Sequence, residues 1–405
     1  MIDLSAVDMS IPGLHRHYRR GDFNPGTLFE ALLRECLQDV GAVWISLLQP
    51  EQLAGFLRDL ERRSEQDLPL YGIPFAVKDN IDVAGMPTTA ACPDFTYMPD
   101  VSASVVQSLV DAGAVPLGKT NMDQFATGLV GVRSPEPWGP CNNALNPQYI
   151  SGGSSSGSAV AVSKQWVSFA LGTDTAGSGR VPASFNNIVG LKPTRGLLST
   201  RGVVPACRSL DVVSIFALTV ADANSVLDCA AVFDAGDPYS RHNSFDNGRR
   251  YFAAPAAPLR IGVPPAEHLQ FFGDDAAAGC FSAAVERIQG EGHELVPMDM
   301  EPFIEAAGLL YSGPWVAERY LVVQDLLEQS PESVLPVIRE IIGAGGGYAA
   351  TDTFTAMYRL QALCQRARPL MDSVDLMVTP TAGTCYRTEE VLEEPVRLNT
   401  NLGYY

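Results

Sequence analysis

Two serine- and glycine-rich segments on either side of a short apolar stretch constrain this chain more than any other feature. Residues 151–158 read Ser-Gly-Gly-Ser-Ser-Ser-Gly-Ser, and residues 172–180 read Gly-Thr-Asp-Thr-Ala-Gly-Ser-Gly-Arg. Residues 159–171 between them are mostly Ala, Val, Phe and Leu. Glycine lets a backbone approach a ligand closely and adopt positive φ angles. We therefore expect two polar turns held by buried structure, as in a pair of catalytic loops, because a solvent-exposed linker would be polar throughout.

The size and composition of the chain predict a large folded core. It has 405 residues, of which 46% are hydrophobic, so one large α/β domain or two average domains would fit. The sequence contains no apolar run of about 18 residues, and its start lacks the basic-then-apolar layout of an export signal. We expect a cytoplasmic protein that does not bind a membrane.

Net charge and cysteine usage exclude several classes of partner. A formal charge of −18 repels phosphate backbones, so no nucleic-acid partner is expected. An anionic substrate would need buried arginines to attract it locally. The eight cysteines are scattered without a Cys-x-x-Cys pair, which favours reduced thiols over disulfides or a metal site.

Hydrophobic periodicity predicts an α/β domain that begins near residue 67. Short apolar runs alternate with amphipathic helical patterns from there on, which is typical of layered α/β structure. Before it we expect a helix over 27–39 with a Thr27–Glu30 capping box, a short strand at 43–48 and a second helix. The charged stretch 58–67 divides an N-terminal helical segment, 1–66, from the main domain, 67–405. The last residues follow a strand and loop, so we expect the C-terminal end of the domain, and any further domain, to be missing.

One motif suggests a nucleotide site. Residues 113–120 read Gly-Ala-Val-Pro-Leu-Gly-Lys-Thr, which fits the phosphate-loop formula. That formula requires a preceding strand and a following helix, so that helix N-terminal amides hold the phosphate. Here a helix precedes the motif and residues 114–117 are themselves β-like. A P-loop-like nucleotide binder using Lys119 therefore remains a weaker alternative.

A second motif suggests a serine hydrolase with a histidine base. Residues 153–157 fit the Gly-x-Ser-x-Gly elbow, which needs an acid and then a histidine downstream. No histidine occurs between His17 and His242. The candidates His242, His268 and His293 all lie in polar neighbourhoods, so a histidine base is not favoured.

The third interpretation uses lysine as the base. Lys78 ends an apolar strand, where burial disfavours its charged form, and a neutral amine can accept a proton from a hydroxyl. Ser154 could relay a proton between Lys78 and Ser178. Backbone amides in a glycine-containing turn could hold an oxyanion: Thr175, Ala176, Gly177 and Ser178. The competing interpretation is a surface salt bridge from Lys78 to Asp79 or Asp82.

These motifs, taken in order, resemble the amidase signature family. The resemblance rests on the segments at 72–80, 118–122, 151–155, 172–178 and 190–194. It implies an amidase-signature fold: α/β, with a mixed central β-sheet layered between α-helices and an N-terminal helical segment. It also implies a triad in which Ser178 is the nucleophile, Ser154 follows a cis peptide bond, and Lys78 is the base. The separation of Ser154 and Ser178 matches the family's interval.

Within that family the chain is most similar to the allophanate hydrolases. The likeness lies in residues 123–128, 176–180, 206–211 and 311–319. It implies that allophanate, a small carboxylate-bearing urea, is the substrate, that Tyr311, Arg319 and Gly128 bind it, and that no cofactor is required. A homodimer and a functional link to urea carboxylase are further implications. Alternatives are a general amidase, a glutamyl-tRNA amidotransferase A-type subunit, or a non-catalytic scaffold. Arg319 could instead pair with Glu318, and Tyr311 could belong to the core.

Overall fold

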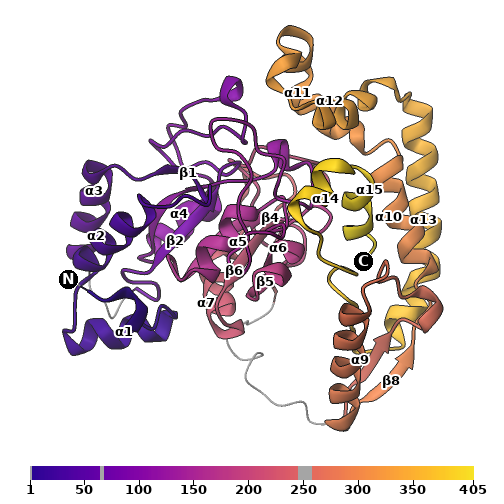
Figure 1. Ribbon diagram of the computed structural model, residues 1–405, viewed down its shortest axis with the longest axis horizontal. Helices are drawn as coiled ribbons and strands as arrows, with labels where there is room; N and C mark the ends of the chain where they lie inside the picture. The colour runs from indigo at the N-terminus through magenta and orange to yellow at the C-terminus, as the bar shows by residue number, and fades with distance from the viewer. Residues whose placement is uncertain (1, 64–67, 245–257) are drawn as a thin grey trace. The chain divides into compact units, whose positions relative to one another are not determined.

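The computed structural model describes residues 2–63, 68–244 and 258–405 (Figure 1). The chain divides into two compact units. The first comprises Met1–Tyr251, Ser333–Leu335 and Arg387–Leu392, and the second comprises Phe252–Glu332, Pro336–Tyr386 and Glu393–Tyr405. We expected a division at residue 66, but the N-terminal helices belong to the first unit. Part of that expected boundary, 64–67, lies outside the described residues.

A six-stranded mixed sheet forms the centre of the first unit. Its strand order is β1-β3-β2-β4-β6-β5, with β2 parallel to β3 and β4 and the other pairs antiparallel. Every residue of β2, β3, β4 and β6 is buried, as expected for strands covered on both faces. The predicted mixed α/β architecture is confirmed. The strands are β1 Trp44–Leu47, β2 Pro74–Lys78, β3 Val115–Thr120, β4 Phe169–Thr173, β5 Val189–Leu191 and β6 Val213–Ala217.

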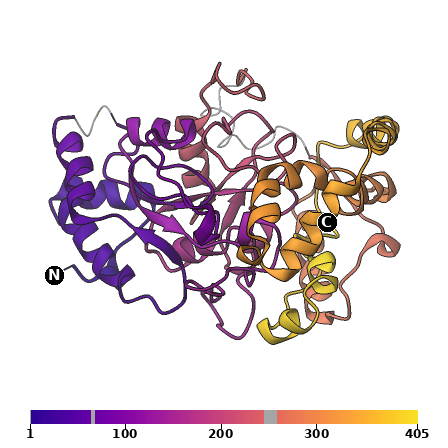
Figure 2. The same ribbon diagram turned by 90° about the horizontal axis from the view of Figure 1, so that it is seen from above.

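Helices cover this sheet and share its core. Figures 1 and 2 place the first three helices together on one side of the unit. Their apolar residues, such as Leu28 and Leu32, belong to the same buried cluster as Phe75 and Phe169 of the sheet. The rings of these two phenylalanines stack with their centroids 5.1 Å apart. This shared core explains why the chain does not divide at residue 66. The helices of this unit are α1 Ile11–Arg20, α2 Pro25–Cys36, α3 Pro50–Glu61, α4 Ser104–Asp111, α5 Ser156–Ser163, α6 Arg180–Phe185 and α7 Val220–Ala230, with most of α14 Thr388–Glu393.

The start of α2 differs from the predicted one. We expected a capping box between Thr27 and Glu30, but the N-cap is Asn24, whose side chain accepts a hydrogen bond of 2.9 Å from the Thr27 amide. Pro25 occupies the first helical position, where its missing N–H costs nothing. The cap therefore lies three residues earlier than the sequence pattern indicated.

A smaller parallel sheet and long helices make up the second unit. Its strand order is β8-β7-β9, with β7 Arg260–Val263, β8 Glu294–Pro297 and β9 Leu376–Met377. Arg366 of α13 pairs with Glu305 of α10 at 2.9 Å, which ties two helices together. Within the described ranges, no helix combines the length and apolar character needed to span a membrane. The helices are α9 Asp275–Gly290, α10 Glu301–Ser312, α11 Val316–Gln329, α12 Pro336–Gly343, α13 Ala350–Asp372 and α15 Arg397–Leu402.

Candidate active site

The first serine- and glycine-rich segment forms a buried turn before α5. The peptide bond between Gly153 and Ser154 is cis, the geometry that the family resemblance implies. Gly152 has a φ of 73°, and a Cβ there would lie 2.8 Å from the Cα of Pro182, so only glycine fits. The turn places the Ser154 hydroxyl in the interior, with no solvent exposure.

Lys78 meets Ser154 where two parallel strands end side by side. Its Nζ donates hydrogen bonds of 2.8 Å to Ser154 Oγ and 2.7 Å to Thr173 Oγ1. Thr173 is the last residue of β4, which pairs with β2. Lys78 has no exposed surface, so the surface salt bridge is wrong, and Asp79 pairs with Lys119 at 3.4 Å instead.

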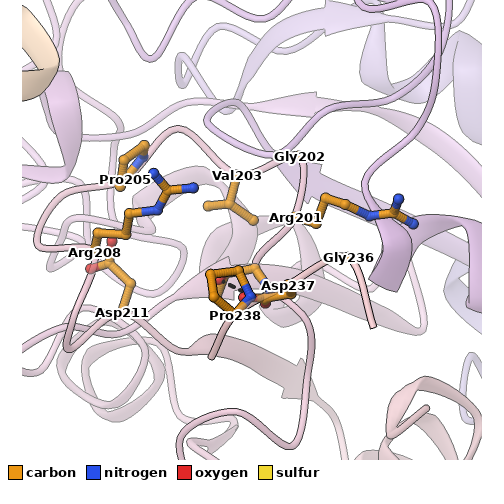
Figure 3. Close-up of a pocket in the computed structure, with 10 residues that line it drawn as sticks. Arg201, Gly202, Val203, Pro205, Arg208, Asp211, Gly236, Asp237 and Pro238 are labelled. Carbon is orange, nitrogen blue, oxygen red and sulfur yellow. Dashed lines mark hydrogen bonds between the residues drawn. The ribbon is translucent and has the colours of Figure 1, made fainter. Parts of the chain in front are cut away.

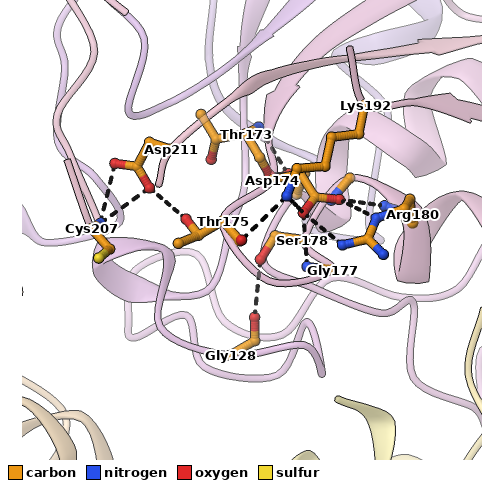
Figure 4. Close-up of polar contacts among 12 residues, drawn as sticks. Gly128, Thr173, Asp174, Thr175, Gly177, Ser178, Arg180, Lys192, Cys207 and Asp211 are labelled. Atoms are coloured by element: carbon orange, nitrogen blue, oxygen red, sulfur yellow. Dashed lines mark hydrogen bonds and ion pairs between the residues drawn. The ribbon is translucent and has the colours of Figure 1, made fainter. Parts of the chain in front are cut away.

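The second serine- and glycine-rich segment is a turn folded around the Asp174 carboxylate (Figure 4). That carboxylate accepts hydrogen bonds from the Gly177 and Gly179 amides at 2.8 and 3.1 Å. It also pairs with Arg180 at 2.9 Å and Lys192 at 3.0 Å. Burial alone would raise the pKa of Asp174, but the bonds to these two cations outweigh burial and hold the pKa well below its usual range. Asp174 is therefore a charged anchor for the turn.

Ser178 lies at the end of this turn and is 5% exposed. Its Oγ is 3.5 Å from the carbonyl oxygen of Gly128, a long contact visible in Figure 4. Gly128 was predicted to bind substrate, and the structure places it against the predicted nucleophile. Ser178 is therefore nearly buried but keeps some solvent exposure, which is compatible with the predicted role of nucleophile.

The backbone amides at 175–178 are not equivalent. The Gly177 amide is directed to Asp174, so it is already engaged. Thr175 is fixed through its side chain, whose Oγ1 donates a 2.5 Å hydrogen bond to Asp211. Asp211 in turn accepts from the Ala206 amide at 2.8 Å. The segment is therefore held rigidly on both sides, as an oxyanion site requires.

Comparison with known proteins assigns the chain to a family. The amidase family model matches residues 40–401. The chain belongs to the amidase family. The chain is 44% identical over 397 residues to the urea amidolyase of Saccharomyces cerevisiae, an alignment that covers 94% of this chain and 21% of that protein. It is also 37% identical over 280 residues to the A subunit of the glutamyl-tRNA(Gln) amidotransferase of Acidobacterium capsulatum, covering 67% of this chain and 58% of that one.

Solved structures agree with this assignment. The allophanate hydrolase of Kluyveromyces lactis is 40% identical and superimposes with a TM-score of 0.90, covering 98% of this chain and 65% of that chain. A crystal structure described only as an amidase gives 26% identity and a TM-score of 0.79. This amidase chain thus spans about a fifth of the yeast urea amidolyase and just under two thirds of the allophanate hydrolase structure.

The two predicted substrate anchors lie in the second unit of the amidase. Tyr311 is on α10 and Arg319 on α11. Tyr311 is 42% exposed, which excludes a core position. Its hydroxyl lies against Gly403, where an added Cβ would collide with it. Their contact with substrate stays a prediction.

A separate cavity of about 110 Å³ is lined in part by Asp211, the partner of Thr175 in the second serine- and glycine-rich segment (Figure 3). Arg208, Asp211 and Asp237 contribute to its wall, and none of the predicted triad residues does. The Asp237 carboxylate already accepts a 2.6 Å hydrogen bond from the Thr200 amide. Asp211 is shared, because it also receives the Thr175 hydroxyl. The cavity therefore touches the site through Asp211.

The phosphate-loop interpretation fails on geometry. Residues 115–120 form strand β3, so they cannot curl around a phosphate. Lys119 has no exposed surface and donates to Thr88 Oγ1 at 3.0 Å and to the carbonyl of Pro87 at 3.2 Å. Its amine is a structural donor inside the sheet.

The histidine-base interpretation fails as well. Ser155, the central serine of the elbow pattern, donates its hydroxyl to the carbonyl of Thr173 at 3.2 Å inside the core. His268 and His293 accept backbone hydrogen bonds through Nδ1, and His242 stacks on the Phe233 ring at 3.8 Å. These histidines have structural roles.

Sequence reasoning missed three residues that order the site: Thr173, Asp174 and Asp123. The first two stand inside the conspicuous segment 172–180, so a polar pair at the end of a buried strand was an available signal. Asp123 stands in segment 123–128, which carries part of the family likeness, but the sequence does not indicate its role, because its partners are backbone amides that only the folded loop brings together.

Proposed function

We propose that this chain is the amidase part of an allophanate hydrolase, which hydrolyses the terminal amide of allophanate and releases ammonia. The hydrogen bond of 2.8 Å between buried Lys78 and Ser154 carries the proposal. It supplies a lysine base next to a serine relay. Similarity to urea amidolyase over nearly the whole chain supports the choice of substrate.

The proposed proton path begins at Lys78. In the structure Nζ is the donor to both hydroxyl groups. We propose that in the neutral amine, which has two N–H donors and one lone pair, one N–H still points to Thr173 while the lone pair accepts the Ser154 proton, so that this hydrogen bond reverses its direction. Ser154 then takes the proton of Ser178, whose oxygen attacks the terminal carbonyl carbon of allophanate. We assign the oxyanion to backbone amides of Thr175, Ala176 and Ser178 and leave out Gly177, whose amide points to Asp174.

In the remaining steps the proton is transferred to the leaving nitrogen and the acyl-enzyme is hydrolysed. The relay returns the proton to the terminal nitrogen, the carbon–nitrogen bond breaks and ammonia leaves. Water then attacks the acyl carbon and its proton passes to Ser154 and Lys78. The bond from that carbon to Ser178 Oγ breaks, Ser178 takes the proton back, and N-carboxycarbamate leaves. This product then loses carbon dioxide elsewhere or spontaneously.

Charge complementarity explains the proposed anchors. The chain carries a formal charge of −18, so an anionic substrate needs a local cation. A guanidinium binds a carboxylate through two parallel hydrogen bonds, and we assign this role to Arg319, with Tyr311 and Gly128 as further contacts. Because allophanate is a carboxylated urea, we also propose a functional link to urea carboxylase. A cytoplasmic homodimer completes the proposal.

Ammonia release tests the assignment. Purified protein is given allophanate, glutamine and a panel of simple neutral amides, with Ser178→Ala as the control. We expect allophanate to be strongly preferred and Ser178→Ala to be folded and inactive. A preference for glutamine would favour the amidotransferase-type activity that the similarity to the glutamyl-tRNA(Gln) amidotransferase suggests. Equal turnover of neutral amides would favour a general amidase, and an active Ser178→Ala would reject the mechanism.

A further inference from the structure

Asp123 folds the loop that reaches the predicted nucleophile. Its side chain has no solvent exposure, and its two oxygens accept three backbone hydrogen bonds. The amides of Val130 and Gly131 donate to Oδ2 at 3.2 and 3.1 Å, and the amide of Arg133 donates to Oδ1 at 2.8 Å. A single carboxylate therefore closes residues 123–133 into one fixed loop.

The same residue also contacts the segment that carries Ser154. The Asp123 amide donates a 3.1 Å hydrogen bond to the carbonyl of Ser154. Its side chain packs on Gly153, where an added Cβ would collide with Asp123 Oδ2. Asp123 thus holds the serine turn through a main-chain bond and a side-chain contact.

Gly128 lies at the tip of this loop and contacts Ser178. The Gly128 carbonyl is the group 3.5 Å from Ser178 Oγ. A Cβ on Gly128 would lie 2.6 Å from Asp123 Oδ2, so carboxylate and tip are in close contact. Arg133 fixes the tip from its other side, since its Nη1 donates to the Thr127 carbonyl at 2.9 Å.

We infer that Asp123 is a positioning residue that sets the Ser154 turn and the Gly128 loop around Ser178 at the same time. This inference rests on the proposed triad, but not on which amide is the substrate. The positioning role requires both carboxylate oxygens as hydrogen-bond acceptors. In Asp123→Asn one of these oxygens becomes an NH₂ group that faces backbone N–H donors. The loop then shifts, and a displacement of about 1 Å at a reacting group lowers a rate by about 100-fold.

The experiment measures covalent labelling of Ser178 by a small fluorophosphonate, followed by intact-protein mass spectrometry. We expect Asp123→Asn to be labelled about 100-fold more slowly than the wild type, with kcat for ammonia release falling similarly and KM changing little. Asp222→Asn is the matched control. Asp222 is also fully buried and accepts a backbone amide, that of Ile11 at 3.0 Å, so it should lose stability but keep its labelling rate.

Two results would overturn the inference: labelling of folded Asp123→Asn at the wild-type rate, or equal slowing in Asp222→Asn. If Asp123→Asn does not fold, Arg133→Met takes its place, because it removes the bond to the Thr127 carbonyl and keeps the apolar stem. We expect slower labelling there too, and a wild-type rate would again overturn the inference. Labelling of the wild type without ammonia release from allophanate would reject the proposed substrate and leave the Asp123 comparison decisive.

Discussion

Lys78 Nζ lies 2.8 Å from Ser154 Oγ, although 76 positions separate the two residues in the chain. Both side chains are fully buried. The contact forms because β2 ends beside β4, and the turn before α5 closes over the ends of these strands. Neither side chain is exposed to solvent, and the amine contacts hydroxyl groups that the protein supplies. Thr173, at 2.7 Å, is the second such hydroxyl.

Replacing the predicted base should abolish turnover. Removing a general base typically costs a factor of about 10² to 10⁴, so we expect Lys78→Met to lower kcat for ammonia release by about 10³. Lys164→Met is the control, because Lys164 lies at the end of α5, outside the predicted site, and should retain full activity. A Lys78→Met enzyme with more than about a tenth of wild-type kcat would argue against lysine as the base.

The Thr173 hydroxyl should increase the activity of the predicted base, Lys78. In Thr173→Val the Lys78 amine loses its hydrogen bond to the Thr173 hydroxyl, while the shape of the side chain is kept. A hydrogen bond of this kind contributes about 1.4 kcal/mol, or a factor of about ten. We expect kcat to fall about tenfold with KM unchanged, and Thr173→Ser, which keeps the hydroxyl, to restore it. Equal losses in both variants would indicate a packing role only.

The residues of the proposed triad could be singled out from the sequence because they stand in locally distinctive surroundings. Glycine-rich turns and a lysine at the end of an apolar strand can be recognised in the sequence, and the family resemblance then suggested a role for each residue. The partners of these residues were not visible in this way. Thr173 reaches Lys78 across 95 positions, and Asp123 recognises backbone amides, which nearly every residue type carries.

Domain boundaries were harder to predict than strands. The expected short strand at 43–48 contains β1, Trp44–Leu47, because a short apolar run between polar residues predicts a strand from its own residues alone. The expected division at residue 66 relied on a charged stretch, and charge alone does not reveal which core a helix joins. Leu28 and Leu32 pack into the cluster that contains Phe75. Only the three-dimensional packing contains that information.

The turn around Asp174 should make stability depend on pH in acid. The folded-state pKa of Asp174 lies below its usual range, whereas the unfolded carboxyl has a pKa of about 3.9. The contribution is therefore complete above about pH 5 and is lost as pH falls below about 4 towards the folded pKa. We expect Asp174→Asn to cost about 3 kcal/mol at pH 7. Chemical denaturation at several pH values should show the difference from wild type shrinking in acid, and a constant difference would contradict the assignment.

Arg319 should act on substrate affinity. A charge-assisted hydrogen bond contributes about 1.5–3 kcal/mol, so we expect Arg319→Met to raise KM for allophanate by about 10- to 100-fold with a smaller change in kcat. Arg319→Lys should recover only part of the loss, because an ammonium lacks the planar fork that binds a carboxylate. Unchanged KM for allophanate in Arg319→Met would remove Arg319 from the proposed site.

The buried pair of Lys119 and Asp79 should determine stability rather than nucleotide binding. Burial lowers the pKa of Lys119 and raises the pKa of Asp79, and their mutual attraction opposes both shifts. Removing one partner leaves the other buried without compensation, which costs about 3–5 kcal/mol. We expect Lys119→Met to lose that much unfolding free energy in urea.

The double variant Asp79→Asn/Lys119→Met shows whether the stability lost in Lys119→Met comes from the unpaired charge of Asp79 or from lost packing of the lysine side chain. If the loss in Lys119→Met comes from an uncompensated carboxylate, removing both charges should cost less than the sum of the two single changes. Thr89 donates to Asp79 through its amide at 2.9 Å, and an asparagine oxygen can still accept that bond. Strict additivity would show that the two side chains do not interact. Millimolar ATP should leave the melting temperature of the wild type unchanged, because an amine enclosed in a strand cannot reach a phosphate, and a clear rise would reinstate the phosphate loop.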